Sequence, residues 1–117
     1  MGTPSDAIKL LPTETELLQV KGDCWKTPGM IGKRQVPGRY TFTDQRILFR
    51  GNGLIEKLRI TFALPYGEIA SIKPCMVGLF IPTGIAVTCK DGGRYCLSVM
   101  KRRKVMELIE EQMQRRD

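Results

Sequence analysis

The sequence predicts a single mainly-β domain, in which an antiparallel sheet of short strands folds on itself and a C-terminal helix covers one open end. Three observations lead to this fold class. Short segments with alternating apolar and polar residues recur along most of the 117-residue chain, and Gly, Pro, Asn and Asp separate them. Only the last segment shows the three- and four-residue spacing of an amphipathic helix. The length suits one core, so we expect residues 14–117 to form the domain after a tail at residues 1–13.

The alternation predicts seven strands. They are residues 16–26, 39–43, 46–50, 58–64, 69–73 and 84–90, followed by a last strand that starts after residue 93. Gly22 is the candidate position for a bulge in the first strand. In the second strand Tyr40 and Phe42 share one face, and in the third Ile47 and Phe49 alternate with residues of the opposite face.

The turn between the last two strands is expected at residues 91–93. A two-residue loop would place Arg94 opposite Cys89 on the apolar face. A three-residue loop places Tyr95 opposite Cys89 and keeps both faces consistent, so we expect three residues. On that register Cys96 points away from Cys89, and we expect no disulfide between them.

Residues 75–81 form a continuous apolar run rather than an alternating one. Such a run is either a strand buried on both faces or an exposed apolar patch that pairs with another protomer. The second alternative makes the segment a protein or homodimer interface. Its members are Met76, Val77, Leu79, Phe80 and Ile81.

The C-terminal segment is the expected helix. Its apolar residues at helical spacing are Val105, Met106, Leu108, Ile109 and Met113. Ser98 is the expected N-cap. Residues 101–104 place four cations at the helix start, where they oppose the helix dipole. We expect them to be solvated and to pair with glutamates one turn on, as Arg103 and Lys104 would with Glu107; a bound anion is the alternative.

Positive charge is concentrated in one part of the chain. The net charge is +7, and residues 26–59 carry eight Lys or Arg against two acidic residues. Such a region is typical of proteins that bind phosphate headgroups, nucleic acids or acidic protein surfaces. The alternative is a basic protein that its charge keeps soluble.

Two loops hold the candidate binding residues. The loop at residues 27–37 has two apolar residues at its middle and basic residues on both sides, which suits an anionic membrane surface. The candidate lipid- or anion-binding residues are Lys26, Met30, Ile31, Lys33, Arg34 and Arg39 from this loop and Arg50, Lys57 and Arg59 from a second. The alternative is that Met30 and Ile31 fold back onto the barrel and the cations are solvated.

The residue types exclude several activities. The chain has no histidine, which rules out a Ser-His-Asp triad, a Cys-His dyad and His-ligated zinc. None of the four cysteines belongs to a C-x-x-C pair, so we expect no metal, no cofactor and no catalytic site. No nucleic-acid-binding motif occurs, and nucleic acid is not an expected partner. Free cysteines without a signal peptide predict a cytoplasmic protein.

Several short motifs, in order, resemble the GRAM domain family. Residues 14–20 and 38–49 are similar to its opening strand and its glycine-led hairpin, although Phe42 stands where the family often has leucine. Residues 64–69 and 82–95 are similar to its later strands, so the resemblance covers about residues 14–113.

The GRAM resemblance implies a pleckstrin-homology-like fold, a seven-stranded partly open barrel capped by a C-terminal helix. The chain is similar in size to small, stand-alone, mostly bacterial members. The resemblance brings no catalytic residues and implies a binding module, with the first inter-strand loop at the open end of the barrel. We therefore expect an anionic membrane surface or phospholipid headgroup as the ligand, and peripheral attachment to the inner face of the membrane.

Overall fold

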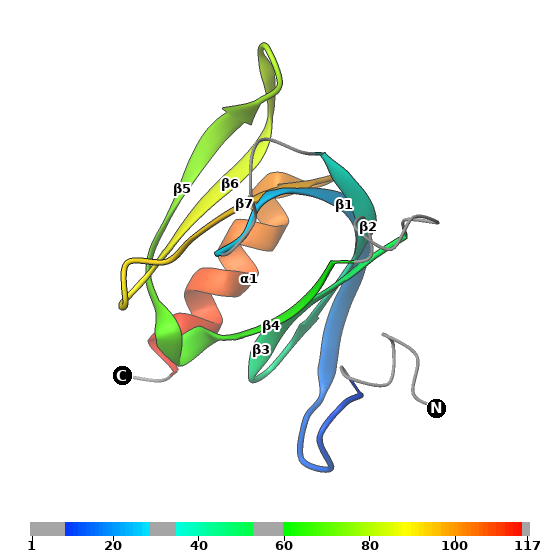
Figure 1. Ribbon diagram of the computed structural model, residues 1–117. Coiled ribbons are helices and arrows are strands. Elements are labelled where there is room, and N and C mark those ends of the chain that lie inside the picture. The colour runs from blue at the N-terminus through cyan, green and yellow to red at the C-terminus, as the bar shows by residue number, and fades with distance from the viewer. Residues whose placement is uncertain (1–8, 29–34, 53–59, 116–117) are drawn as a thin grey trace.

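The computed structural model describes residues 9–28, 35–52 and 60–115 (Figure 1). The elements are β1 (Glu16–Lys26), β2 (Val36–Thr43), β3 (Arg46–Gly51), β4 (Thr61–Pro65), the 3-10 helix η3 (Tyr66–Glu68), β5 (Ile69–Val77), β6 (Ile81–Cys89), β7 (Arg94–Val99) and α1 (Arg102–Gln114). The strands form one antiparallel sheet in the order β4-β3-β2-β1-β7-β6-β5. The sheet curls around α1, and the predicted fold class is confirmed.

Strand β1 joins the two halves of the curled sheet. Its residues from Glu16 to Cys24 pair with β2, and those from Gly22 to Lys26 pair with β7. Gly22 belongs to both ladders, and a Cβ there would lie 2.3 Å from the carbonyl oxygen of Ser98. The expected bulge at Gly22 is wrong, because the irregularities of β1 fall on either side of it. Glycine is needed here because backbone from β7 comes too close for any side chain.

Aromatic side chains fill the interior. Tyr40 and Phe49 pack as a tilted pair with ring centroids 4.6 Å apart, and the ring centroids of Phe62 and Tyr95 lie 4.7 Å apart across the barrel. The Tyr40 hydroxyl donates a 2.7 Å hydrogen bond to the carbonyl oxygen of Asp23. The buried tyrosine therefore has a partner for its polar end, as buried phenols usually require.

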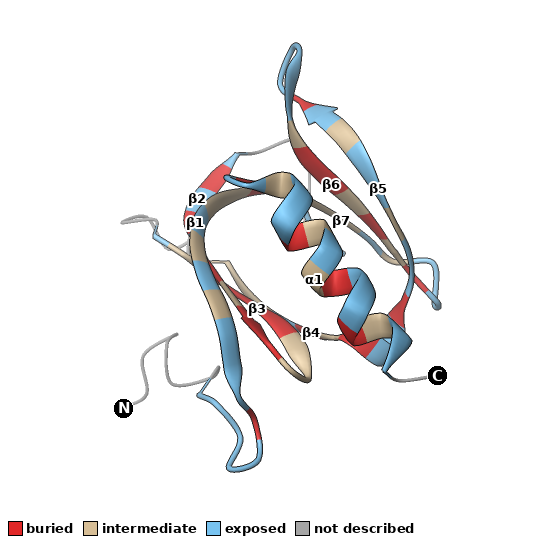
Figure 2. Cartoon of the chain, turned by 180° about the vertical axis from the view of Figure 1, so that it is seen from behind, coloured by how far each residue is buried: buried red, intermediate tan, exposed pale blue. Residues whose placement is uncertain are grey.

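Helix α1 covers the open side with one face. Val105 and Ile109 are fully buried against the sheet, while Met106, Leu108 and Met113 are partly buried. Figure 2 shows buried positions recurring along α1 between exposed turns. The helix starts after Lys101, whose left-handed φ of 58° breaks it from β7. The expected N-cap at Ser98 is wrong, since β7 continues through that residue.

The β6–β7 hairpin has a different strand register from the predicted one, and its loop begins one residue earlier. Tyr95 lies opposite Val87 rather than Cys89, and Cys89 instead exchanges backbone hydrogen bonds with the turn. The loop has three residues as expected, but they are 90–92 and not 91–93. A two-residue shift keeps every side chain on its predicted face, which is why the apolar pattern alone could not detect it.

A buried ion pair ties the segment before β1 to the β2–β3 hairpin. Arg46 donates to both carboxylate oxygens of Glu14, at 2.8 and 3.0 Å, and also to the carbonyl oxygen of Lys9 at 2.8 Å. Glu14 accepts further hydrogen bonds from the Thr43 hydroxyl and the Leu11 amide. Burial alone would raise the pKa of this carboxyl, but these hydrogen bonds, with that from Arg46 foremost, lower the pKa from 4.5 to about 2.

Candidate anion-binding site

Three cations lie in a row across the outer face of the sheet. In the register of β1, β2 and β3, Lys21 is directly opposite Arg39, and Arg39 is directly opposite Arg50. All three side chains are exposed, and neighbours in such a row are roughly 5 Å apart at the backbone. Like charges placed directly opposite each other destabilise a sheet. The arrangement therefore costs stability that a bound anion would restore.

No carboxylate of the described residues neutralises this row. The ion pairs among the described residues join Glu14 to Arg46 and Glu111 to Arg115, and neither pair includes a residue of the row. Arg39 instead donates a 3.3 Å hydrogen bond to the side-chain oxygen of Gln19. The Gln19 amide nitrogen donates in turn to the Thr41 hydroxyl at 3.3 Å. Gln19 thus orients Arg39, and no described residue pairs with the charge of Arg39.

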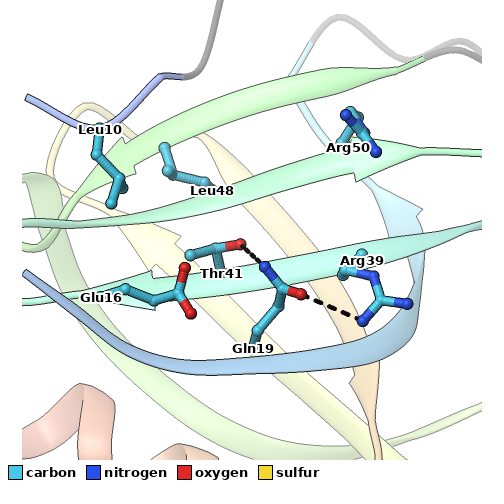
Figure 3. Close-up of a pocket in the computed structure, with 7 residues that line it drawn as sticks. All are labelled: Leu10, Glu16, Gln19, Arg39, Thr41, Leu48 and Arg50. Carbon is cyan, nitrogen blue, oxygen red and sulfur yellow. Dashed lines mark hydrogen bonds between the residues drawn. The ribbon is translucent and has the colours of Figure 1, made fainter. Parts of the chain in front are cut away.

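A shallow pocket of about 330 Å³ adjoins the row (Figure 3). Figure 3 places Arg39 and Arg50 at one end and Leu10, Leu48 and Glu16 toward the other, with Gln19 and Thr41 between them. Positive charge therefore gathers at one end of the pocket, and the single carboxylate lies away from it. This polarity suits a ligand that carries negative charge at one end only.

The structure places three of the predicted site residues. Arg39 and Arg50 come together as described above, but Lys26 lies five residues beyond Lys21 on β1 and pairs with β7 instead. The remaining predicted members, Met30, Ile31, Lys33, Arg34, Lys57 and Arg59, lie outside the described residues.

Lys21 and Gln19 were missed by sequence reasoning. Both lie on the outward face of the first strand, as the alternation indicates. Their place beside Arg39 depends on the β1–β2 register, which the alternation does not determine. A search for cations on the outward faces of all the strands would have found Lys21.

The segment 75–81 forms the tip of the β5–β6 hairpin, which projects beyond the rest of the sheet (Figure 1). Leu79 and Phe80 are 86% and 79% exposed, and Met76 and Ile81 are more than half exposed. Val77 is buried, unlike the other four predicted interface residues. The sequence left two alternatives for this segment, a buried strand or an exposed apolar patch. Four of its residues, Met76, Leu79, Phe80 and Ile81, are exposed as in the second alternative.

Two of the four cysteines have thiols whose pKa is raised well above neutral pH. All four are free, and Cys75 and Cys96 approach to 3.9 Å between their sulfur atoms. Burial raises the pKa of Cys24 to about 11 and that of Cys96 to about 12. A thiol that stays protonated at neutral pH is a weak nucleophile and a weak metal ligand. Within the described part of the chain, no three acidic, Cys or His side chains gather as metal ligands would.

Comparison with solved structures shows the fold. The C-terminal domain of an unknown protein from Leishmania infantum matches with a TM-score of 0.67 and 20% sequence identity, over 86% of this chain and 84% of that one. The Vps36 N-terminal PH domain matches with a TM-score of 0.66 and 17% identity, over 92% and 84%. The chain therefore has the pleckstrin-homology-like fold that the GRAM resemblance implied.

Other comparisons bring no relative in sequence. No protein-family model matches the chain, and no curated protein matches it. The likeness to GRAM domains within this fold therefore stays a prediction. Among the described helices, none combines the length and the apolar character needed to cross a membrane.

Proposed function

We propose that the domain is a non-enzymatic binding module for the phosphate groups of anionic membrane lipids, and that Lys21, Arg39 and Arg50 hold the phosphate. The observation that carries this proposal is the row itself, in which three exposed cations face each other across three strands without an acidic partner among the described residues. The pleckstrin-homology-like fold supports it, since domains of this architecture typically bind ligands rather than catalyse reactions.

Arginine suits this role because its planar guanidinium donates two parallel hydrogen bonds to phosphate oxygens. Two guanidinium groups on adjacent strands can share one phosphate and thereby relieve their mutual repulsion. Gln19 holds Arg39 from the side, which lowers the entropy that the side chain loses on binding. Glu16, toward the other end of the pocket, disfavours ligands with a second anionic group there.

We expect Arg50→Thr to weaken binding to anionic vesicles by about tenfold or more, because a hydrogen bond to a charged group contributes roughly 1.5–3 kcal/mol. The same change should raise the free energy of unfolding by about 0.2–1 kcal/mol, since it removes a like-charge pair. Co-sedimentation with phosphatidylcholine vesicles that contain phosphatidylserine measures the first effect, and urea denaturation measures the second.

Arg94→Thr is the matched control. Arg94 is also exposed on a strand, lies opposite Thr88, and forms no ion pair within the described residues, so the loss of charge is the same. Equal loss of vesicle binding in both variants would mean that only net charge matters. That result would contradict a site at Arg39 and Arg50.

A further inference from the structure

We propose that the tip of the β5–β6 hairpin inserts into the interfacial layer of an anionic bilayer. The tip is defined as Met76, Leu79, Phe80 and Ile81. This goes beyond the phosphate site, because it assigns a second surface of the molecule, on other strands, to direct contact with lipid.

The tip is exposed because the hairpin beneath it is held in place. The β5–β6 ladder continues to the pair Val77 and Ile81, and the chain turns at Gly78 with a φ of 60°. Val77 is buried, and the ring of Trp25 from β1 reaches to within 3.8 Å of the position that a Gly78 Cβ would take. The apolar side chains beyond this base thus project into solvent. An isolated patch of this kind marks a surface that another phase or molecule covers.

Basic residues gather at the base of the hairpin. Arg102, the first residue of α1, donates hydrogen bonds from Nη1 to the carbonyl oxygens of Cys75 and Gly84, at 3.1 and 3.4 Å. This contact brings the start of α1, with the four cations of residues 101–104, against the hairpin. Lys73 adds another exposed cation on β5.

Among the described residues, no ion pair neutralises the charge of this basic run. The expected ion pairs of Arg103 and Lys104 with Glu107 are wrong, since the ion pairs among the described residues do not include them. Lys101, Arg103 and Lys104 are exposed, and the neighbouring Met100 is 70% exposed. Apolar side chains next to free cations are the combination that anionic bilayers attract.

The same charges argue against a second copy of the chain as the occupant. Two tips brought together would also bring two runs of four cations together, and their repulsion would oppose the contact. A negatively charged bilayer satisfies both the apolar and the cationic groups at once. Charge complementarity therefore selects the membrane over self-association.

The test compares the 117-residue chain with the double variant Leu79→Ser/Phe80→Ser. Co-sedimentation with phosphatidylcholine–phosphatidylserine vesicles should weaken by about a hundredfold, because two large apolar side chains no longer enter the lipid. Leu17→Ser is the matched control, since Leu17 is also an exposed apolar residue but lies on β1 away from the tip. It should bind vesicles like the wild type.

Insertion itself can be observed with Phe80→Trp. On addition of the same vesicles, its fluorescence should shift to the blue and be quenched by brominated acyl chains. The wild type, in which Trp25 is the only tryptophan, supplies the background. An unshifted and unquenched signal would overturn the proposal, as would wild-type vesicle binding by the double variant or no vesicle binding by the wild type.

Two further readouts separate the alternatives. Light scattering that shows a dimer, dissociated by Leu79→Ser/Phe80→Ser while vesicle binding persists, would reassign the tip to self-association. Titration with inorganic phosphate, followed by the NMR signals of Arg39 and Arg50, reports on the phosphate site separately from the tip. The double variant should retain that response and Arg50→Thr should lose it, so the proposed function and the tip proposal can fail independently.

Discussion

Replacing Gly22 with alanine should destabilise the domain by about 3 kcal/mol, at the upper end of what overpacking usually costs. The new Cβ would lie 2.3 Å from the carbonyl oxygen of Ser98 and 3.0 Å from the Tyr40 ring. The nearest atom is backbone, which cannot move without separating β1 from β7. Because β1 carries both ladders at this residue, the strain falls on the junction between the halves of the sheet.

Urea denaturation, followed by circular dichroism, measures this effect. Gly67→Ala is the control, because a Cβ at Gly67 meets nothing within 4 Å and the change should alter stability little. If both variants unfold at the same urea concentration, the junction tolerates a side chain, and the close approach at Gly22 is not what holds β1 in place.

Replacing Glu14 with glutamine should remove about 3 kcal/mol of stability at neutral pH. A carboxyl whose pKa falls from 4.5 to about 2 on folding stabilises the folded state by roughly this amount once it is ionised. The sign follows from the lowered pKa: the contribution is complete above pH 4.5 and is lost as the pH falls toward 2. A glutamine amide at this position also cannot accept two strong hydrogen bonds from Arg46, because only one of its two polar atoms is an acceptor.

Free energies of unfolding measured between pH 7 and pH 2 test this. The difference between wild type and Glu14→Gln should shrink through the window from pH 4.5 to 2. Glu110→Gln removes an exposed helix carboxylate that forms no ion pair within the described residues, and it should leave the profile unchanged. A pH-independent difference for Glu14→Gln would mean that packing, and not the charge, connects this segment to the β2–β3 hairpin.

The number of strands and their approximate positions along the chain could be predicted because two-residue alternation is a local property of the sequence. Tyr40, Phe42, Ile47 and Phe49 are buried, as their spacing indicates. Leu48 is buried as well, although it lies on the outward face, because it lines the pocket beneath Leu10 of the N-terminal segment. The local alternation of apolar and polar residues cannot predict burial beneath a segment that is distant in the chain.

The candidate site was only half predictable, for a related reason. Arg39 and Arg50 were found because their region is rich in cations, but their place directly opposite each other depends on the β2–β3 register. The burial of residues 75–81 could not be predicted, since a continuous apolar segment has the same sequence pattern whether it is buried or exposed. Its exposure follows from the length of the β5–β6 hairpin, which extends past the strands that could have covered it.

The sheet is a strip whose two outermost strands, β4 and β5, follow each other in the chain and are linked only by η3. No ladder of backbone hydrogen bonds joins these two strands: the covalent chain passes between them, and Tyr66 of η3 donates its hydroxyl hydrogen to the carbonyl oxygen of Thr43 at the end of β2. We expect transient opening of the sheet to require the least free energy between β4 and β5, because these strands can separate there without breaking a ladder of backbone hydrogen bonds. Amide hydrogen exchange should accordingly be slowest around β1, in the middle of the sheet, and become faster toward the edge strands β4 and β5.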